Sequence, residues 1–321
     1  MPPEHPSPFS LQAVRRFAGE VWSVYFALLK VMVPALIIVK LLDVVGATAV
    51  LAQGIGPLMQ LVGLPESMGI VWAAAMLTNI YTGMIVFVEY AGQQPLTVAQ
   101  VTVLGSMILV AHSLPVEGAV ARAVGVSWRA TIALRVGGAL ALGMLLNLAY
   151  GLSGTLQTEA RLLWQPSAVD DSLVIWALDQ LRLLLFVLVA IATLMAVLRL
   201  LRALGIERLM HCLLAPVLRI IGIRREAANI TIIGTTLGLS YGAGLLIREA
   251  RAGALTRRDV FLTMGFLGLC HSVIEDTLLI LMLGADLSGI LWARLGFALL
   301  VIGVLARLPF LDRRLAATER T

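Results

Sequence analysis

Two short segments of the chain place a histidine, a serine and a carboxylate in the middle of long apolar runs. Residues 112–117 read His-Ser-Leu-Pro-Val-Glu, and residues 271–276 read His-Ser-Val-Ile-Glu-Asp. A carboxylate at mid-membrane costs on the order of 3 kcal/mol on insertion scales, and it usually faces a partner or a pathway. We therefore predict a binding site for a polar substrate or a coupling ion, made by His112, Ser113, Glu117, His271, Ser272, Glu275 and Asp276.

The chemistry of these side chains allows three uses. A carboxyl group in apolar surroundings holds a proton more readily than it does in water, so Glu117 and Asp276 suit proton coupling, with sodium as the other candidate ion. Imidazole and carboxylate groups also suit several divalent transition metals, which makes the two histidines, Glu117 and Asp276 candidate metal ligands. The structural alternative is that the same groups only pair with one another between helices.

A proline distinguishes the two segments. Pro115 removes a backbone donor and, together with Gly118, predicts a break in the first helix. A broken helix exposes carbonyl groups and dipole ends that coordinate polar solutes or cations. The second segment has Ile274 in place of the proline, so we expect its helix to be unbroken or less sharply broken.

Further polar residues lie in two glycine-containing apolar segments. They are Thr78, Asn79, Tyr81 and Thr82 in one segment, and Thr235, Thr236, Ser240 and Tyr241 in the other. As a set these neutral donors and acceptors suit an uncharged polar ligand, although Ser and Thr also cap broken helices. Two arginines, Arg135 and Arg294, lie inside later apolar segments, where they either snorkel to the membrane surface or pair with a carboxylate inside.

The sequence motifs give little support for an enzyme. Residues 238–242 read Gly-Leu-Ser-Tyr-Gly and fit the G-x-S-x-G pattern of serine hydrolases, with His271 as a conceivable base. No strand is expected before this pattern, and the matching position in the first half is Ile80. The H-E-x-x-H motif of zinc proteases does not occur in the sequence. We therefore expect that the protein is not an enzyme.

Composition places these motifs in a membrane. Of the 321 residues, 60% are hydrophobic and 13% are charged, against about 45–50% and 25% in soluble domains. At roughly 20 apolar residues per crossing, the chain supplies about six membrane-spanning helices. Aromatic residues make up 6% of the chain and the arginines are scattered, so a nucleic-acid partner is not expected. The expected partners are the lipid bilayer and a small-molecule or ion substrate, with a homo-oligomer left open.

The chain contains an internal repeat. A shift of 159 residues brings His112-Ser113 onto His271-Ser272, Pro57 onto Pro216 and Arg135 onto Arg294. We predict a tail (1–16), a first repeat (17–153), a linker (154–172), a second repeat (173–308) and a tail (309–321). Each repeat has a long apolar helix (17–44, 173–200), an amphipathic helix (46–63, 206–222), a glycine-containing segment (68–90, 226–248) and two long segments (97–124 and 128–151; 257–284 and 287–308).

Charges predict how the repeats sit in the membrane. Arg15-Arg16 and Arg313-Arg314 place both termini in the cytoplasm. Equivalent loops carry opposite charge bias, because Arg122 and Arg129 flank a turn whose counterpart holds Asp286. This pattern is typical of inverted-topology repeats. Segments 68–90 and 226–248 have both ends on one side, so each is expected to be a re-entrant hairpin, which leaves about three transmembrane helices per repeat.

These motifs resemble those of the nucleoside recognition, or Gate, domain family. The similar stretches are 79–83 (Asn-Ile-Tyr-Thr-Gly), 104–117, and the second copy from Gly238 to Asp276. The family includes the spore maturation A and B membrane proteins and the membrane portion of ferrous iron transporter B. This chain has no nucleotide-binding domain, and Cys270 precedes only the second histidine.

The resemblance implies an integral transporter or permease of a bacterial inner (plasma) membrane, with the substrate or coupling ion held at the repeat interface. The expected solute is small and polar, for example a nucleoside or a related compound. No cofactor is expected beyond a coupling proton or sodium ion. Divalent metal transport and a non-transporting role in membrane assembly are the alternatives.

Overall fold

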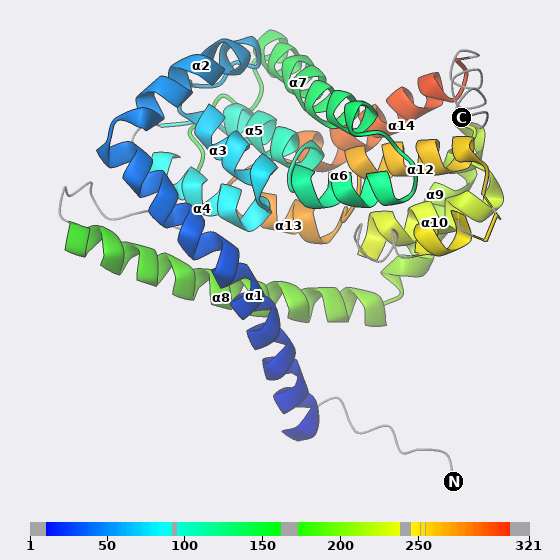
Figure 1. The fold of residues 1–321 in the computed structure, drawn as a ribbon, viewed down its shortest axis with the longest axis horizontal. Coiled ribbons are helices and arrows are strands. Elements are labelled where there is room, and N and C mark those ends of the chain that lie inside the picture. The colour runs from blue at the N-terminus through cyan, green and yellow to red at the C-terminus, as the bar shows by residue number, and fades with distance from the viewer. Residues whose placement is uncertain are drawn as a thin grey trace.

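The protein is built from helices. The computed structural model describes residues 11–91, 95–161, 173–237, 245–250, 252–253 and 255–308. Within these ranges the regular structure is helical, apart from an isolated antiparallel bridge between Thr97 and Glu159 (Figure 1). The predicted all-α fold is therefore confirmed.

The helices follow one another in two similar series. The first series is α1 (Leu11–Val44), α2 (Ala47–Leu61), α3 (Met68–Leu77), α4 (Ile80–Ala91), α5 (Val98–Val110), α6 (Leu114–Ala123) and α7 (Trp128–Ser153). The second is α8 (Leu173–Ala203), α9 (Ile206–Ile220), α10 (Arg225–Leu237), α12 (Arg257–Leu269), α13 (Glu275–Leu281), the π-helix η1 (Ser288–Ala293) and α14 (Arg294–Leu305). Residues 245–250 form a further helical segment.

Several helices have the length and composition of membrane spans. Within the described residues, five segments qualify: Val14–Leu42, Val98–Ala123, Trp128–Ser153, Leu173–Leu201 and Ser288–Leu305. Large apolar side chains such as Trp22, Leu185 and Leu300 lie more than half exposed on their outer faces. Such surfaces are expected against lipid and not against water. The sixth predicted crossing, 257–284, is divided into the short helices α12 and α13.

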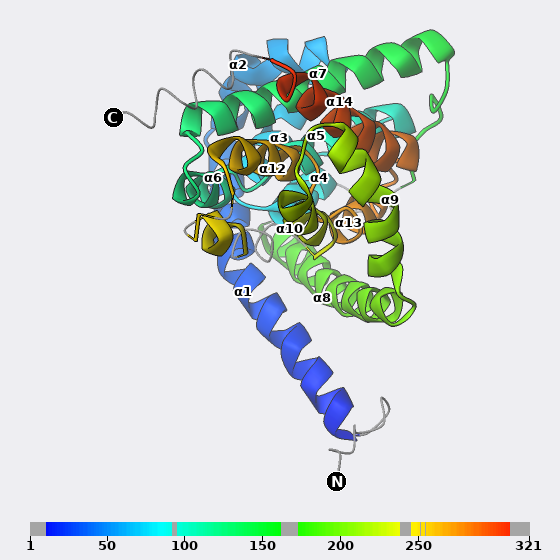
Figure 2. The ribbon, with the colours of Figure 1, turned by 90° about the vertical axis from the view of Figure 1, so that its right-hand side faces the viewer.

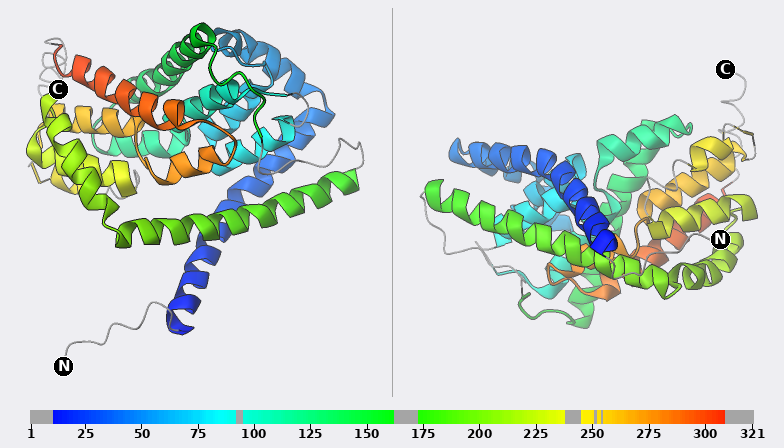
Figure 3. Two further views of the ribbon diagram at one scale, coloured as in Figure 1. Left: turned by 180° about the vertical axis from the view of Figure 1, so that it is seen from behind. Right: turned by 90° about the horizontal axis from the view of Figure 1, so that it is seen from below.

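Helices α1 and α8 pack against each other at one side of the bundle, and α1 extends away from it (Figures 1 and 2). The view from below shows the two helices crossing (Figure 3). The Tyr25 hydroxyl donates to the carbonyl of Leu184 over 3.1 Å. These two residues are equivalent under the shift of 159, so the two halves meet here through the same position of each.

The centre of the bundle is formed by α5 and α12. Both helices are buried along nearly their whole length, and they contact each other and α7. A helix that is apolar all round lies inside a protein. Each begins with a capping box, Thr97 with Gln100 in α5 and Thr256 with Asp259 in α12. These caps satisfy the free amide groups at the two helix starts.

The segment predicted as the first hairpin consists of two short helices packed side by side, α3 and α4. Neither is long enough to cross a membrane. Gly83 allows their close approach, because a Cβ atom at this position would lie 2.6 Å from Cβ of Ala75. In the second half, the described part is α10 and the helical segment 245–250. The re-entrant placement and the inverted orientation of the halves stay predictions.

The chain breaks twice near the centre, once between α5 and α6 and once between α12 and α13. Ser113 and Ser272 have left-handed φ values of 49° and 45° at the two breaks. The prediction that the second helix is unbroken or less sharply broken is wrong, since α12 ends at Leu269 and α13 starts only at Glu275.

The reason is a tertiary hydrogen bond at each break. The Ser113 amide donates to the Ala75 carbonyl over 3.0 Å, and the Val273 amide donates to the Thr235 carbonyl over 2.8 Å. A backbone group released from a helix is therefore satisfied by the neighbouring segment of its own half. A proline is not needed to stabilise the second break.

Candidate functional site

The two breaks bring the two histidines together. His112 Nε2 lies 3.3 Å from His271 Nε2, and the ring centroids are 5.0 Å apart. The residues are 5% and 3% exposed. The site therefore lies in the protein interior, with one histidine from each half.

Hydrogen bonds fix the tautomer of both rings. His112 Nδ1 lies 3.0 Å from the Ile108 carbonyl, and His271 Nδ1 lies 2.7 Å from the Leu267 carbonyl. A carbonyl oxygen only accepts, so each Nδ1 carries the hydrogen. In the neutral ring, Nε2 then presents a lone pair toward the other histidine. This is the arrangement of metal-binding histidines, whose second nitrogen usually donates to a carbonyl or carboxylate.

Two carboxylates complete the cluster. Glu117 Oε1 lies 3.3 Å from Nε2 of each histidine, and Asp276 Oδ2 lies 3.9 Å from each. Glu117 is 9% exposed and Asp276 is 7% exposed. Four electron-pair donors therefore converge in an apolar interior. We call His112, Glu117, His271 and Asp276 the central cluster.

The spacing of three of these atoms matches a metal site. In a tetrahedral site with metal–ligand bonds of about 2.0–2.1 Å, neighbouring ligand atoms lie about 3.3–3.4 Å apart. The two Nε2 atoms and Glu117 Oε1 are all separated by 3.3 Å. Together they can occupy three corners of such a site, with Asp276 further out. The predicted metal ligands are thus brought together, three of them tightly.

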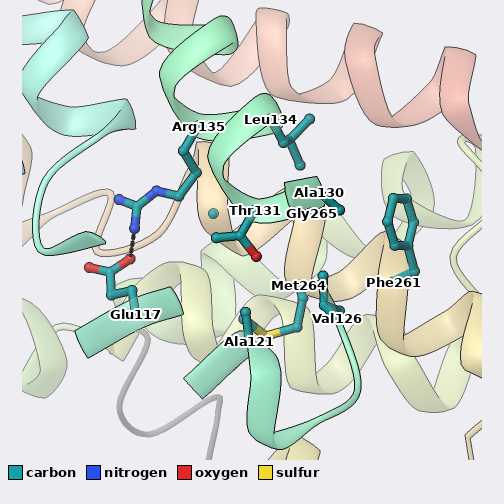
Figure 4. Close-up of a pocket in the computed structure, with 11 residues that line it drawn as sticks. Glu117, Ala121, Val126, Ala130, Thr131, Leu134, Arg135, Phe261, Met264 and Gly265 are labelled. Atoms are coloured by element: carbon teal, nitrogen blue, oxygen red, sulfur yellow. Dashed lines mark hydrogen bonds and ion pairs between the residues drawn. The ribbon is translucent and has the colours of Figure 1, made fainter. Parts of the chain in front are cut away.

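Buried arginines flank the carboxylates differently in the two halves. Arg135 is 1% exposed. It donates from Nη1 to Glu117 Oε2 (Figure 4) and from Nε to the Val110 carbonyl. Arg294 is fully buried, and its Nη2 donates to Thr277 Oγ1 over 3.4 Å. Among the described residues, Arg294 Nε and Nη1 and Asp276 Oδ2 make no hydrogen bond. Neither arginine snorkels to the surface, and only the first is tightly paired.

The neutral polar residues of the two glycine-containing segments mostly hold the backbone. Hydroxyl groups of Thr78, Thr235 and Thr236 donate to carbonyls one turn earlier in their own helices. Asn79 Oδ1 accepts from the Thr82 amide, which caps the start of α4. Ser113 Oγ donates to the Thr78 carbonyl over 2.9 Å and so ties the break to the hairpin.

The other predicted site residues differ in burial. Tyr81 and Glu275 are half-buried, while Ser272 is buried at the second break. Ser240 and Tyr241 lie outside the described residues. The sequence left the role of Arg135 open, although its match to Arg294 across the repeat marked both positions.

A small cavity adjoins Glu117 and Arg135. Its volume is about 20 Å³, and a volume of about 10–15 Å³ holds one water molecule. It is lined by side chains of α6, α7 and α12 together with the turn residue Val126 (Figure 4). Sequence reasoning missed its lining residues Thr131, Phe261 and Met264, since Phe261 and Met264 are apolar and Thr131 belongs to no polar motif of the sequence.

The helical fold, its apolar outer surface and its buried ionic centre define a polytopic membrane protein. The chain is 30% identical over 281 residues to a Bacillus subtilis (strain 168) protein described as the uncharacterized membrane protein YvoD. The match covers 86% of this chain and 88% of that protein, so the chain belongs to the same family of membrane proteins. No family model and no solved structure matches the chain.

Proposed function

We propose that the protein is a transporter that carries a divalent transition-metal ion across the membrane, with the central cluster as its binding site. The observation that carries the proposal is the triangle of lone-pair donors, His112 Nε2, His271 Nε2 and Glu117 Oε1, with sides of 3.3 Å. Imidazole nitrogen together with carboxylate oxygen favours ions such as Mn²⁺, Fe²⁺, Co²⁺ and Zn²⁺ over Mg²⁺ or Ca²⁺.

Two features favour a transported ion over a structural one. A structural metal site is usually closed by four protein ligands, whereas three ligands leave a position open for exchange. The cluster also has no excess negative charge, because Glu117 and Asp276 are balanced by Arg135 and Arg294. A divalent ion at the centre brings uncompensated positive charge, which weakens its binding. Transport needs such release, since a bound ion must also leave.

A nucleoside fits the described structure less well. The space beside the central cluster is about 20 Å³, while pockets for small organic ligands hold about 300–1,000 Å³. Binding a nucleoside there would require the surrounding helices to separate. Membership in the Gate family is part of the present proposal, and so is coupling to protons or sodium. These rest on the resemblance of the motifs.

A flux assay tests the function. Purified protein is reconstituted into liposomes that contain a metal-quenched fluorophore, and Mn²⁺, Fe²⁺, Co²⁺ or Zn²⁺ is added outside. We expect quenching by at least one of these ions, and a fall in rate of at least about tenfold in Glu117→Gln and in His112→Ala, because each removes a ligand. Glu66→Gln and His211→Ala are matched controls at residues outside the cluster, and both should transport normally.

Two results would overturn the proposal. One is metal flux that is unchanged in Glu117→Gln and His112→Ala, because the cluster would then not be the route of the ion. The other is the absence of metal flux in liposomes that take up a labelled nucleoside, which would favour the solute implied by the family resemblance. Absence of both fluxes from folded protein would favour a role in membrane assembly.

A further inference from the structure

The cavity beside Glu117 adjoins a pocket at the protein surface. It shares Val126 and Phe261 with a second pocket of about 430 Å³. That pocket is lined by the turn between α6 and α7, by residues near 247–250, and by the start of α12. Gly125 and Arg257 at its rim are exposed. Val126, which is 8% exposed, and Phe261 therefore lie between the surface pocket and the cavity that borders Glu117.

The equivalent region of the other half is packed shut. The shift of 159 takes the cavity residues Ala121, Val126, Thr131 and Met264 to Ile280, Ala285, Ile290 and Gly105. A Cβ atom on Gly105 would lie 2.4 Å from Ile280 Cγ2, 3.5 Å from Ile290 Cγ2 and 3.7 Å from Ala285 Cβ. In the other half, three of the four equivalent positions thus pack around the fourth, Gly105, and leave no space for a side chain there.

A second contact closes the same region. Gly289 is equivalent to Ala130, and its Cβ would lie 2.3 Å from Thr102 Cγ2 and 3.2 Å from Ser106 Oγ. Two hydrogen bonds of 2.8 Å hold the elements together, from the Asp286 amide to Thr102 Oγ1 and between Tyr150 and Ser288 hydroxyls. The phenylalanine that borders the open route, Phe261, corresponds to Thr102 in the closed region.

We infer that these two equivalent regions are the two ends of one permeation pathway. One end, called the open end, is partly open, with only Val126 and Phe261 between a surface pocket and the cavity at Glu117, and the other, called the closed end, is packed shut. The open end runs past Val126 and Phe261. The closed end is the contact of Gly105 with Ile280, Ile290 and Ala285. This inference rests on the proposed transport function and assigns the pathway that the ion takes to and from the central cluster.

The charges identify the sides of the two ends. Arg122, Arg129 and Arg257 are exposed around the open end, whereas the turn at the closed end carries Asp286. By the positive-inside rule the open end faces the cytoplasm. Transport then requires the two halves to exchange their arrangements, so that the contact at Gly105 opens while Val126 and Phe261 come together. Rocking of one repeat against another around a fixed site is the usual form of this change.

The cluster shows the same difference between the halves. At the open end, Glu117 contacts both imidazoles and its own arginine, Arg135. On the closed side, Asp276 stands 3.9 Å from the imidazoles. Within the described residues, two nitrogens of Arg294 make no hydrogen bond, compared with one, Nη2, of Arg135. In the exchanged state, Asp276 would pair with Arg294 and move onto the histidines. The polar atoms of the closed side that lack hydrogen bonds would then gain partners.

Thiol labelling of the detergent-purified protein tests the pathway without measuring transport. One cysteine is added at Phe261, which is partly exposed, or at its equivalent Thr102, which is fully buried. The background is Cys212→Ser, which keeps the buried Cys270, and this background alone and exposed Gln60→Cys are the controls. A charged, water-soluble thiol reagent should modify Phe261→Cys at least about tenfold faster than Thr102→Cys, because thiol reactivity requires access to water. Similar rates at the two sites would overturn the inference.

The closed contact is then loosened deliberately. Gly105→Leu places a side chain where Ile280 packs, and it should raise the labelling of Thr102→Cys and lower that of Phe261→Cys. If Gly105→Leu does not fold, Ile280→Ala trims the same contact and should raise the labelling of Thr102→Cys. Unchanged rates in a folded variant would overturn the pathway. A contrast in labelling without metal flux would instead contradict the transport function, and flux without contrast would contradict the pathway alone.

Discussion

Nε2 of His112 lies 3.3 Å from Nε2 of His271, its equivalent in the other half of the chain. Tyr25 and Leu184 are a second equivalent pair in direct contact. Contacts between equivalent residues are what the predicted repeat leads one to expect at an interface between its halves. The central cluster takes one histidine and one carboxylate from each half, and neither half contains the site by itself.

The first prediction concerns this shared site. His112→Ala and His271→Ala should weaken Zn²⁺ or Mn²⁺ binding by similar factors, on the order of 100-fold, because each removes an equivalent ligand. Isothermal titration of the detergent-purified variants measures the change. His211→Ala, on α9, should bind like the parent protein. A loss in only one of the two cluster variants would contradict a site shared by both halves.

Arg135 provides the second prediction. Removing one partner of a buried ion pair costs about 3–5 kcal/mol, because the other charge is left uncompensated. Arg135→Gln should therefore lower the stability of the metal-free protein. A divalent ion restores positive charge beside Glu117, so metal should raise the melting temperature of this variant by more than that of the parent protein.

Thermal unfolding with and without Mn²⁺ measures both effects. Arg129→Gln is the matched control, since Arg129 is an exposed arginine near the start of the same helix, α7. It should behave like the parent protein in both conditions. An equal effect of metal on Arg135→Gln and on the parent would mean that the arginine does not oppose metal binding.

The third prediction compares the two breaks. Ser113 Oγ donates to the Thr78 carbonyl, and a hydrogen bond of this kind contributes about 0.5–1.5 kcal/mol. Ser113→Ala should lower the free energy of unfolding by about this amount. Ser272→Ala changes the same residue type at the same left-handed backbone and should have a smaller effect. Chemical denaturation in detergent measures the difference, and equal losses would contradict the assigned role of Ser113.

The central cluster was predictable because its residues occur twice. Two copies of a His-Ser pair with a carboxylate, placed in equivalent apolar segments, indicate a meeting of equivalent groups near the axis. The helix breaks were only half predictable. Pro115 predicts the first break. The second break depends on the hydrogen bond from the Val273 amide to the Thr235 carbonyl, and no local sequence pattern predicts this contact between segments.

Other features follow only from packing. The position of Arg135 along its helix is compatible with snorkelling or with burial of its side chain. Which of the two occurs depends on where Glu117 lies in space. The open and closed ends of the pathway are formed by equivalent positions of a repeated sequence. Their difference arises from the arrangement of the halves in one conformational state. It cannot be read from the sequence, because the same sequence encodes every state.

The fourth prediction separates the two carboxylates. In the described state, Glu117 contacts the imidazoles at 3.3 Å while Asp276 stands 3.9 Å away. Glu117→Gln should therefore weaken metal binding strongly, and Asp276→Asn should weaken it much less. If the halves exchange arrangements during transport, Asp276 becomes the closer ligand in the second state. Both substitutions should then reduce flux by at least about tenfold, because removal of either ligand interrupts the cycle.

Paired binding and flux measurements on the same preparations decide this point. Binding reports the state that is most populated, whereas flux requires both states in turn. A large loss of flux with nearly normal binding in Asp276→Asn is the result expected from exchange, since an amide at this position leaves the described triangle intact. Normal flux in Asp276→Asn would show that Glu117 serves both states alone. Equal losses of binding in the two variants would show that both carboxylates hold the ion at the same time.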